Sequence, residues 1–255
     1  MDSQRRSRSV NGSEDRRESR PREDDEPRDF VKYTIYHLRP EWRRLPPDER
    51  AAGREAAARL LNPAAGAPVV RTYSLVGTKA GAEMLIWAIS PDLTSVQELH
   101  ARIVGTSMGG YLDIPYSYLG MGRRSEYIAG HEHEGQEGSS TRRTPSDQPY
   151  LFVYPFVKRR DWYQLPYDQR RRIMGEHFRI GHRYPNVRIH TGYSFGLDDA
   201  EFILAFEAES PAEFLDLVQE LRTTEASRYT ALETPIFTAV AVPPARMLEL
   251  AEGIP

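Results

Sequence analysis

The hydrophobic pattern of this chain occurs twice along its length. Apolar and aromatic runs of strand length lie at residues 29–37 and 150–155. Each run is followed by Leu-Pro-x-Asp, in which the proline suits the start of a helix and the aspartate favours its positive end. The two Leu-Pro-x-Asp sequences begin at Leu45 and Leu165, 120 positions apart. Two equivalent halves indicate one architecture that is used twice.

The remaining elements follow in the same order in both halves. The first half predicts helices at 47–61 and 93–104 and strands at 69–76, 82–88 and 116–121. The second half predicts helices at 167–183 and 211–222 and strands at 187–195, 201–208 and 236–242. Each half is thus β-α-β-β-α-β, the ferredoxin-like order. Because helices cover only one face of each sheet, we expect the other faces to pack together as an α+β barrel within one chain.

Two polar stretches bound these halves. Residues 1–28 are mostly Arg, Glu, Asp and Ser, too polar to offset their ordering entropy, and predict a disordered tail. Residues 130–147 are rich in Gly, Glu and Ser and predict a flexible linker. The folded halves are then residues 29–129 and 148–245.

Composition narrows the class of protein. The 255 residues carry a formal net charge of −3, which gives no electrostatic footprint for nucleic acid. There is no cysteine, which excludes disulfides, thiolate metal sites and cysteine nucleophiles. No apolar run approaches the roughly 20 residues that span a bilayer, and the N-terminus lacks the apolar core of a signal peptide. We expect a soluble, cytoplasmic protein. The run Arg170-Arg171-Arg172 favours a solvated helix face over an anion-binding one.

The second half contains reactive residues that the first half lacks. His177 takes the position of Ala57, 120 residues earlier. Lys158 and His190 also have no counterpart of their own type. A lone histidine on an apolar helical face can be a core residue. Because His190 begins the next strand and Tyr154 ends the previous one, however, we expect His177, His190 and Tyr154 to open on one cavity.

A neutral imidazole in an apolar pocket is a common axial ligand of haem iron. Such a ligand needs an acceptor for its other ring nitrogen. Glu225, after the last predicted helix, is the candidate acceptor, with a solvated glutamate as the alternative.

Five motifs follow one another in the second half: Tyr154-Pro155-Phe156-x-Lys158-Arg159, Asp161-Trp162-Tyr163-x-Leu165-Pro166, Glu176-His177, Gly196-Leu197-Asp198-Asp199-x-Glu201 and Leu221-Arg222-x-x-Glu225-x-Ser227-Arg228-Tyr229. In this order they resemble the chlorite dismutase superfamily, and within it the coproheme decarboxylase branch. The resemblance covers residues 30–243. It implies tandem ferredoxin-like repeats in each subunit, a ring-shaped homopentamer and one haem site in the C-terminal half.

The resemblance also implies roles for individual residues. His177 would be the proximal iron ligand, and Glu225 the partner of its imidazole. Tyr154 matches a tyrosine that becomes a radical during oxidative decarboxylation. Lys158 and Ser227 match residues beside the porphyrin propionates.

Two further propionate contacts are implied less directly. Either Arg142 or Arg143 would supply the arginine expected upstream of the tyrosine. Tyr118 is a further candidate contact.

Position 190 departs from the family pattern. In chlorite dismutases an arginine stands thirteen residues after the proximal histidine, whereas here that residue is His190. Loss of the guanidinium argues against chlorite decomposition, because its charge would hold an oxyanion near the iron. A histidine there could act as general base toward hydrogen peroxide.

The resemblance implies that the protein converts iron coproporphyrin III, or coproheme, into haem b. Hydrogen peroxide would be the oxidant, and coproporphyrin ferrochelatase a transient donor of the porphyrin. A chlorite dismutase or haem peroxidase on the same scaffold is one alternative. A non-catalytic haem-binding protein is another.

Overall fold

The computed structural model describes residues 26–62, 68–127 and 140–254 of the chain. Most of the predicted tail and much of the predicted linker therefore lie outside the described residues. None of the helices in the described ranges combines the length and the apolar content that a membrane crossing requires.

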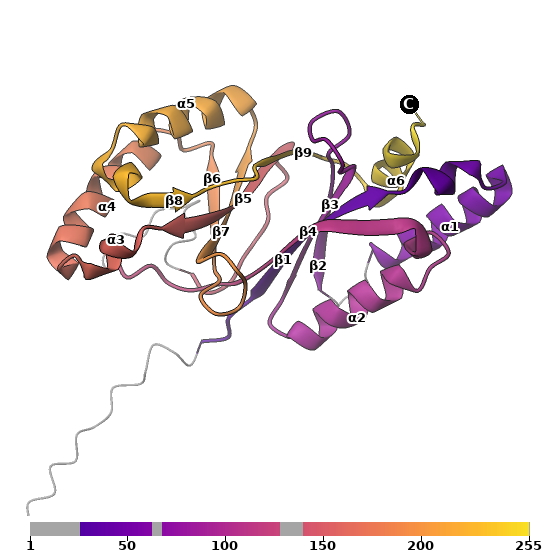
Figure 1. The fold of residues 1–255 in the computed structure, drawn as a ribbon, viewed down its shortest axis with the longest axis horizontal. Helices are drawn as coiled ribbons and strands as arrows, with labels where there is room; N and C mark the ends of the chain where they lie inside the picture. Colours follow the sequence, from indigo (N-terminus) through magenta and orange to yellow (C-terminus); the bar gives the residue numbers. More distant parts are fainter. Residues whose placement is uncertain (1–25, 63–67, 128–139, 255) are drawn as a thin grey trace, which may run out of the picture.

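Both halves have the predicted order of elements (Figure 1). The first comprises β1 (Phe30–Leu38), α1 (Pro47–Leu60), β2 (Val69–Ser74), β3 (Met84–Ser90), α2 (Leu93–Val104) and β4 (Leu112–Met121), with short 3₁₀ helices at Pro40–Arg44 and Gly109–Tyr111. The second comprises β5 (Tyr150–Lys158), α3 (Arg160–Gln164), α4 (Tyr167–Gly181), β6 (Arg188–Tyr193), β7 (Phe202–Ala208), α5 (Pro211–Arg222), a 3₁₀ helix at Glu225–Tyr229, β8 (Thr230–Leu232) and β9 (Phe237–Ala241). A last helix, α6 (Pro244–Glu252), follows.

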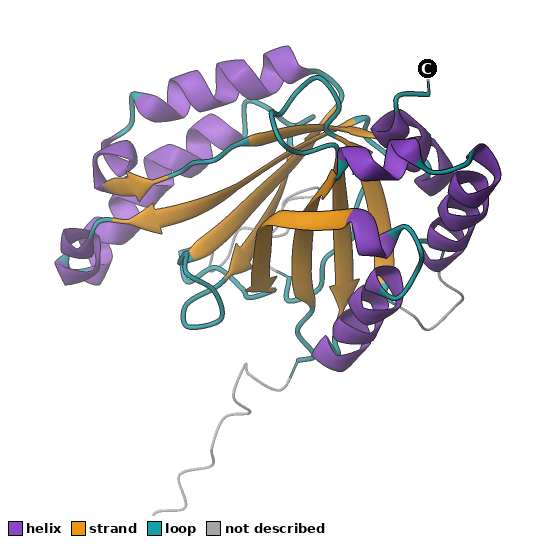
Figure 2. Cartoon of the chain, turned by 45° about the vertical axis from the view of Figure 1, so that its right-hand side comes forward, coloured by secondary structure: helices purple, strands orange, loops and turns teal. Residues whose placement is uncertain are grey.

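The strands form one continuous antiparallel sheet that closes on itself (Figure 2). The first half contributes the order β4-β1-β3-β2, and the second contributes β9-β5-β7-β6. The halves join edge to edge where β4 pairs with β6 and β2 pairs with β9, while β8 extends the end of β5. The predicted α+β barrel of tandem ferredoxin-like repeats is thus confirmed, with its two sheets joined along their edges.

The junction between β4 and β6 depends on two glycines. Its single ladder pair is Met121 with Tyr193. Beside it, a Cβ atom added to Gly120 would come within 3.0 Å of the Gly192 Cα atom. Side chains at these positions would push the strands apart, so glycine allows the two halves to meet here.

The inside of the barrel is filled by side chains. One buried cluster includes Tyr33, Trp87, Leu151, Ile203 and Phe237, contributed by strands of both halves. The Tyr33 and Trp87 rings stack with centroids 5.3 Å apart. Because this interior is packed, space for a ligand has to lie on the outer faces, between the sheet and its helices.

On the first half, α6 fills that outer space. Its residues Met247, Leu248 and Ala251 belong to the same buried cluster as Trp42 and Ala57. The Glu252 carboxylate accepts the Trp42 indole N–H at 3.0 Å. It also pairs with two arginines of α1, Arg50 at 3.2 Å and Arg54 at 2.9 Å. The C-terminal helix therefore packs on the N-terminal half, and the predicted boundary at residue 245 falls inside it.

Candidate functional site

A cavity of about 430 Å³ lies on the outer face of the second half. Its floor is formed by alternate side chains of β5, β6 and β7, and its roof by α4 and α5. The residues from Arg123 to Tyr127, which follow β4, line one side. The sheet contributes the largest apolar surface: Phe156, Phe202, Leu204 and Phe206. Its size and mostly apolar lining are typical of small-molecule sites.

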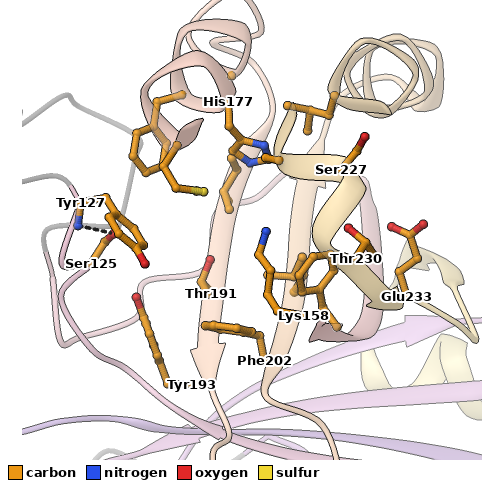
Figure 3. Close-up of a pocket in the computed structure, with 18 of the residues that line it drawn as sticks. Ser125, Tyr127, Lys158, His177, Thr191, Tyr193, Phe202, Ser227, Thr230 and Glu233 are labelled. Atoms are coloured by element: carbon orange, nitrogen blue, oxygen red, sulfur yellow. Dashed lines mark hydrogen bonds between the residues drawn. The ribbon is translucent and has the colours of Figure 1, made fainter. Parts of the chain in front are cut away.

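His177 projects from α4 into this cavity (Figure 3). Pro166 caps α4 and Asp168 stands in its first turn, so the helix begins where the sequence predicts. Burial, and to a smaller extent the charge of Lys158, lowers the pKa of His177 to about 4. The imidazole is therefore neutral at pH 7 and able to ligate a metal.

Glu225 is not placed as the partner of that imidazole. Its carboxylate accepts from the Arg172 guanidinium at 2.8 Å, and no hydrogen bond joins it to His177 among the described residues. Nor is Glu225 part of the cavity wall. To accept a hydrogen bond from the second ring nitrogen of His177, the Glu225 carboxylate would have to leave Arg172.

Tyr154 lies in the floor of the cavity, on β5. Its ring stacks on Phe206 with centroids 5.8 Å apart, and 7% of its surface is exposed. Burial raises the pKa of the phenol, although the nearby Arg222 acts in the opposite direction. Tyr154 is therefore a neutral phenol held in apolar surroundings.

Lys158 stands at the end of the same strand and extends toward His177 (Figure 3). Its ammonium lies 4.4 Å from the centre of the Trp162 ring, a cation–π contact. Burial lowers the pKa of Lys158 to about 8, with the charge of Glu201 acting in the opposite direction. Glu201 in turn accepts the main-chain N–H of Lys158 and the Tyr163 hydroxyl, at 2.8 and 2.6 Å.

Of the two candidate arginines, only Arg143 lines the cavity. Its guanidinium donates to the Thr191 carbonyl at 2.6 Å, and it is 5% exposed. Arg142 instead pairs with Asp29 and is half-exposed. Ser227 also lines the cavity, and its hydroxyl donates to the carbonyls of the preceding turn.

Two predicted site residues lie elsewhere. Tyr118 belongs to the packed interior of the barrel, so the prediction that it contacts a ligand in this site is wrong. His190 also faces that interior, 4.9 Å from the Trp87 ring. Its neighbours Ile189 and Thr191 line the cavity. Because successive strand residues point to opposite faces, His190 cannot share the cavity, and its predicted role as peroxide base is wrong.

Sequence reasoning missed four cations in the cavity wall: Arg123, Arg124, Arg170 and Arg222. Arg222 forms an ion pair with Glu233, and Arg170 donates to the Tyr127 hydroxyl at 3.0 Å. Arg222 belongs to the motif that runs from Leu221 to Tyr229. Arg170 begins the run of three arginines whose sequence favours a solvated helix face. With Arg143 and Lys158, they give the cavity a basic perimeter.

Residues 49–242 match the family described as Chlorite dismutase, and the chain belongs to that family. A relative that is 34% identical over 174 residues is the coproheme decarboxylase of Mycolicibacterium smegmatis. That alignment covers 68% of this chain and 73% of the relative.

Solved structures show the same fold. A chlorite dismutase variant from Candidatus Nitrospira defluvii has a TM-score of 0.80 at 24% identity, covering 89% of this chain and 97% of that one. A protein from Thermus thermophilus, described as heme-binding, has a TM-score of 0.78 at 24% identity, covering 89% of this chain and 95% of that one. These likenesses concern the fold alone.

Proposed function

We propose that this protein binds iron coproporphyrin III in the cavity and decarboxylates the propionates on its rings A and B, giving haem b with hydrogen peroxide as the oxidant. The observation that carries the proposal is the convergence of His177, Tyr154 and Lys158 on one apolar cavity. Family membership and the relative from M. smegmatis support this choice of substrate.

The residues of the cavity fit an iron porphyrin. Among the described residues no cluster of three or more His, Asp or Glu could hold a metal ion, so a multidentate protein site is not indicated. A single neutral histidine suits iron whose remaining ligands come from a macrocycle. The apolar floor suits the ring, and the basic perimeter suits its carboxylates.

Bound iron porphyrin would supply the oxidising equivalents that peroxide delivers. His177 would hold the iron from the α4 side. Lys158 and Arg143 would hold carboxylates, and the Ser227 hydroxyl would turn from the carbonyls of Arg222 and Thr224 to donate to a carboxylate. These contacts would fix a propionate near Tyr154, which is the positioning that the reaction needs.

Tyr154 would carry the oxidation to the propionate. It would lose an electron and its phenolic proton, and the resulting radical would take a hydrogen atom from the propionate β-carbon. The packing of Tyr154 against Phe206 would exclude water from the radical. His190 takes no part, because it lies on the opposite face of the sheet.

The overall stoichiometry balances for each propionate. One C–H bond and one C–C bond break, one C=C bond forms, and carbon dioxide leaves. This oxidation releases two electrons and one proton. Together with one further proton from solvent, they reduce one hydrogen peroxide to two waters. Two peroxides are therefore consumed per haem b.

The test is to incubate the purified protein with iron coproporphyrin III and peroxide and to follow porphyrin masses. We expect the singly and then the doubly decarboxylated products, at two peroxides per haem b. Absence of both products would refute the proposal. Added chlorite should release no oxygen, because β6 presents Ile189, Thr191 and Tyr193 to the cavity rather than a guanidinium.

We also infer, from the family resemblance, a homopentamer in the cytoplasm that receives its porphyrin from coproporphyrin ferrochelatase. Light scattering of the purified protein tests the first inference. Transfer of porphyrin from the loaded ferrochelatase, compared with release into buffer, tests the last.

A further inference from the structure

The barrel interior contains a buried acid–base pair that the proposed reaction does not use. His190 Nε2 donates to Glu207 Oε2 at 2.7 Å, and both side chains are almost fully buried. The imidazole and the Trp87 ring pack edge to face, with centroids 4.9 Å apart. Buried ionisable groups destabilise a fold unless they are paired, so a pair inside an otherwise apolar barrel calls for an explanation.

The same carboxylate oxygen holds a segment outside the barrel strands. Glu207 Oε2 also accepts the main-chain N–H of Ser146, at 2.8 Å. Ser146 belongs to residues 140–149, which lead into β5 and contain no helix or regular strand before Tyr150. Without a ladder of its own, this segment is held by separate hydrogen bonds near its ends, such as that from the Ala241 N–H to the Pro149 carbonyl at 2.8 Å. The bond from Ser146 to Glu207 fixes its middle.

Three residues before Ser146, the segment carries a cavity residue. Arg143 donates from its guanidinium to the carbonyl of Thr191, the residue that follows His190. Its main-chain N–H donates to the Asp29 carboxylate at 2.9 Å. The segment is thus fixed at two points. Arg143 is bonded to Thr191 of β6, and Ser146 is bonded to Glu207 of β7, the strand that pairs with β6.

We propose that Glu207, oriented by His190, is a positioning residue that holds Arg143 in the cavity wall, ready to pair with a porphyrin carboxylate. The inference rests on the proposed function for the identity of that carboxylate. Loss of the Ser146 anchor would loosen the backbone between Arg143 and the next anchor at Gln148, and binding would then have to order it again. The buried pair therefore acts on the ligand through Arg143, from the other face of the sheet.

A double-mutant cycle tests this coupling through the affinity of the protein for iron coproporphyrin III, titrated by absorbance without peroxide. We expect Arg143→Gln and Glu207→Leu each to weaken binding about tenfold, and the double variant to bind no more weakly than either. Glu207→Gln should retain near wild-type affinity, because its amide oxygen still accepts from Ser146. Fully additive losses, or wild-type affinity in Glu207→Leu, would overturn the proposal.

Two further variants separate positioning from general loss of stability. Ser146→Pro removes the N–H that Glu207 accepts and leaves Glu207 and His190 in place, so it should reproduce the loss in Glu207→Leu even if the latter folds poorly. Ser146→Ala, which removes the hydroxyl but keeps the N–H, should bind like wild type. Ile203→Ala, on the same strand and fully buried in the barrel, should destabilise the fold and leave the affinity unchanged. Equal losses in Ile203→Ala would mean that Glu207 is merely structural.

Hydrogen exchange gives a readout that needs no porphyrin. In Glu207→Leu the amides of residues 140–149 should exchange faster than in wild type. In Ile203→Ala the exchange rates of these amides should rise no more than the exchange rates of the amides in the barrel strands. Failure of wild type to bind the porphyrin would refute the proposed function, and unchanged exchange at 140–149 in Glu207→Leu would refute the anchor separately.

Discussion

Lys158 is held in a place that disfavours its charge, and the consequence can be measured on the protein without ligand. Its pKa falls from the ordinary 10.5 to about 8 because the ammonium is buried. That difference corresponds to about 3 kcal/mol of destabilisation of the folded protein at pH 7. Replacing Lys158 by methionine removes this cost but also the cation–π contact with Trp162, worth about 1 to 2 kcal/mol. We therefore expect Lys158→Met to stabilise the protein by about 1 to 2 kcal/mol at pH 7.

The sign of the pH dependence follows from the same difference. Between pH 8 and 10.5 the unfolded chain binds more protons at Lys158 than the folded protein does. The wild type should therefore gain stability relative to Lys158→Met as the pH rises through this window, by up to about 3 kcal/mol. Groups remote from Lys158 titrate alike in both proteins and cancel in the comparison. His177, whose pKa burial and the Lys158 charge lower to about 4, is neutral throughout this pH range.

Urea unfolding at pH 7, 8, 9 and 10, followed by tryptophan fluorescence, measures this difference. Lys79→Met, at the β2–β3 turn outside the cavity, controls for loss of any lysine. If the difference between wild type and Lys158→Met stays constant from pH 7 to 10, the buried ammonium does not carry the energy assigned to it. If the control shows the same trend, the effect is not specific to the cavity.

Further expectations concern the proposed ligand, the radical and the C-terminal helix. His177→Ala should lose the visible spectrum of histidine-ligated iron coproporphyrin, whereas His182→Ala, outside the cavity wall, should keep it. Tyr154→Phe should bind the porphyrin like wild type, because the stacking on Phe206 is retained, yet form product at least about 100-fold more slowly by mass analysis; unchanged product formation would make Tyr154 only a core aromatic. Glu252→Ala leaves Arg50, Arg54 and the Trp42 indole without their shared acceptor, and should lower the free energy of unfolding by about 3 kcal/mol in urea; a loss below about 1 kcal/mol would show that α6 is held by apolar contacts alone.

The fold and half of the candidate site were predictable, because both depend on local pattern. The helix at Tyr167–Gly181 and the sheet strands lie within a few residues of their predicted ranges. His177 was found because the helical period and comparison of the halves both single it out. Tyr154, Lys158 and Ser227 were found from the family resemblance, and all three lie in the cavity wall.

The face to which a strand residue points was not predictable for His190. A strand with one solvated face shows alternating polarity, but β6 is covered on both faces, by the barrel interior and by the cavity. Its sequence therefore does not show whether the odd-numbered or the even-numbered residues face the ligand. A shift of one residue exchanges the two faces.

The cations of the cavity wall were missed for a different reason. The Arg170 guanidinium lies 5.9 Å from the centres of the Tyr127 and Tyr167 rings. The run Arg170-Arg171-Arg172 around it nevertheless has the composition of an exposed helix face. Only the packing of α4 against the segment that follows β4 brings it to the cavity. Such long-range proximity has no local pattern.

The terminal helix α6 also restricts how the protein could be re-engineered. The duplicated architecture offers two equivalent chambers, and the chain closes one of them with its own C-terminus. Introducing a histidine at Ala57, the counterpart of His177, would therefore not create a second binding chamber, since Ala57 is buried in the same apolar cluster as Met247 and Leu248. A second site would require the loss of α6 first, and with it the Glu252 contacts that hold α1. The asymmetry between the halves is thus maintained by a stabilising helix, so that two equivalent sites could be built only at the expense of stability.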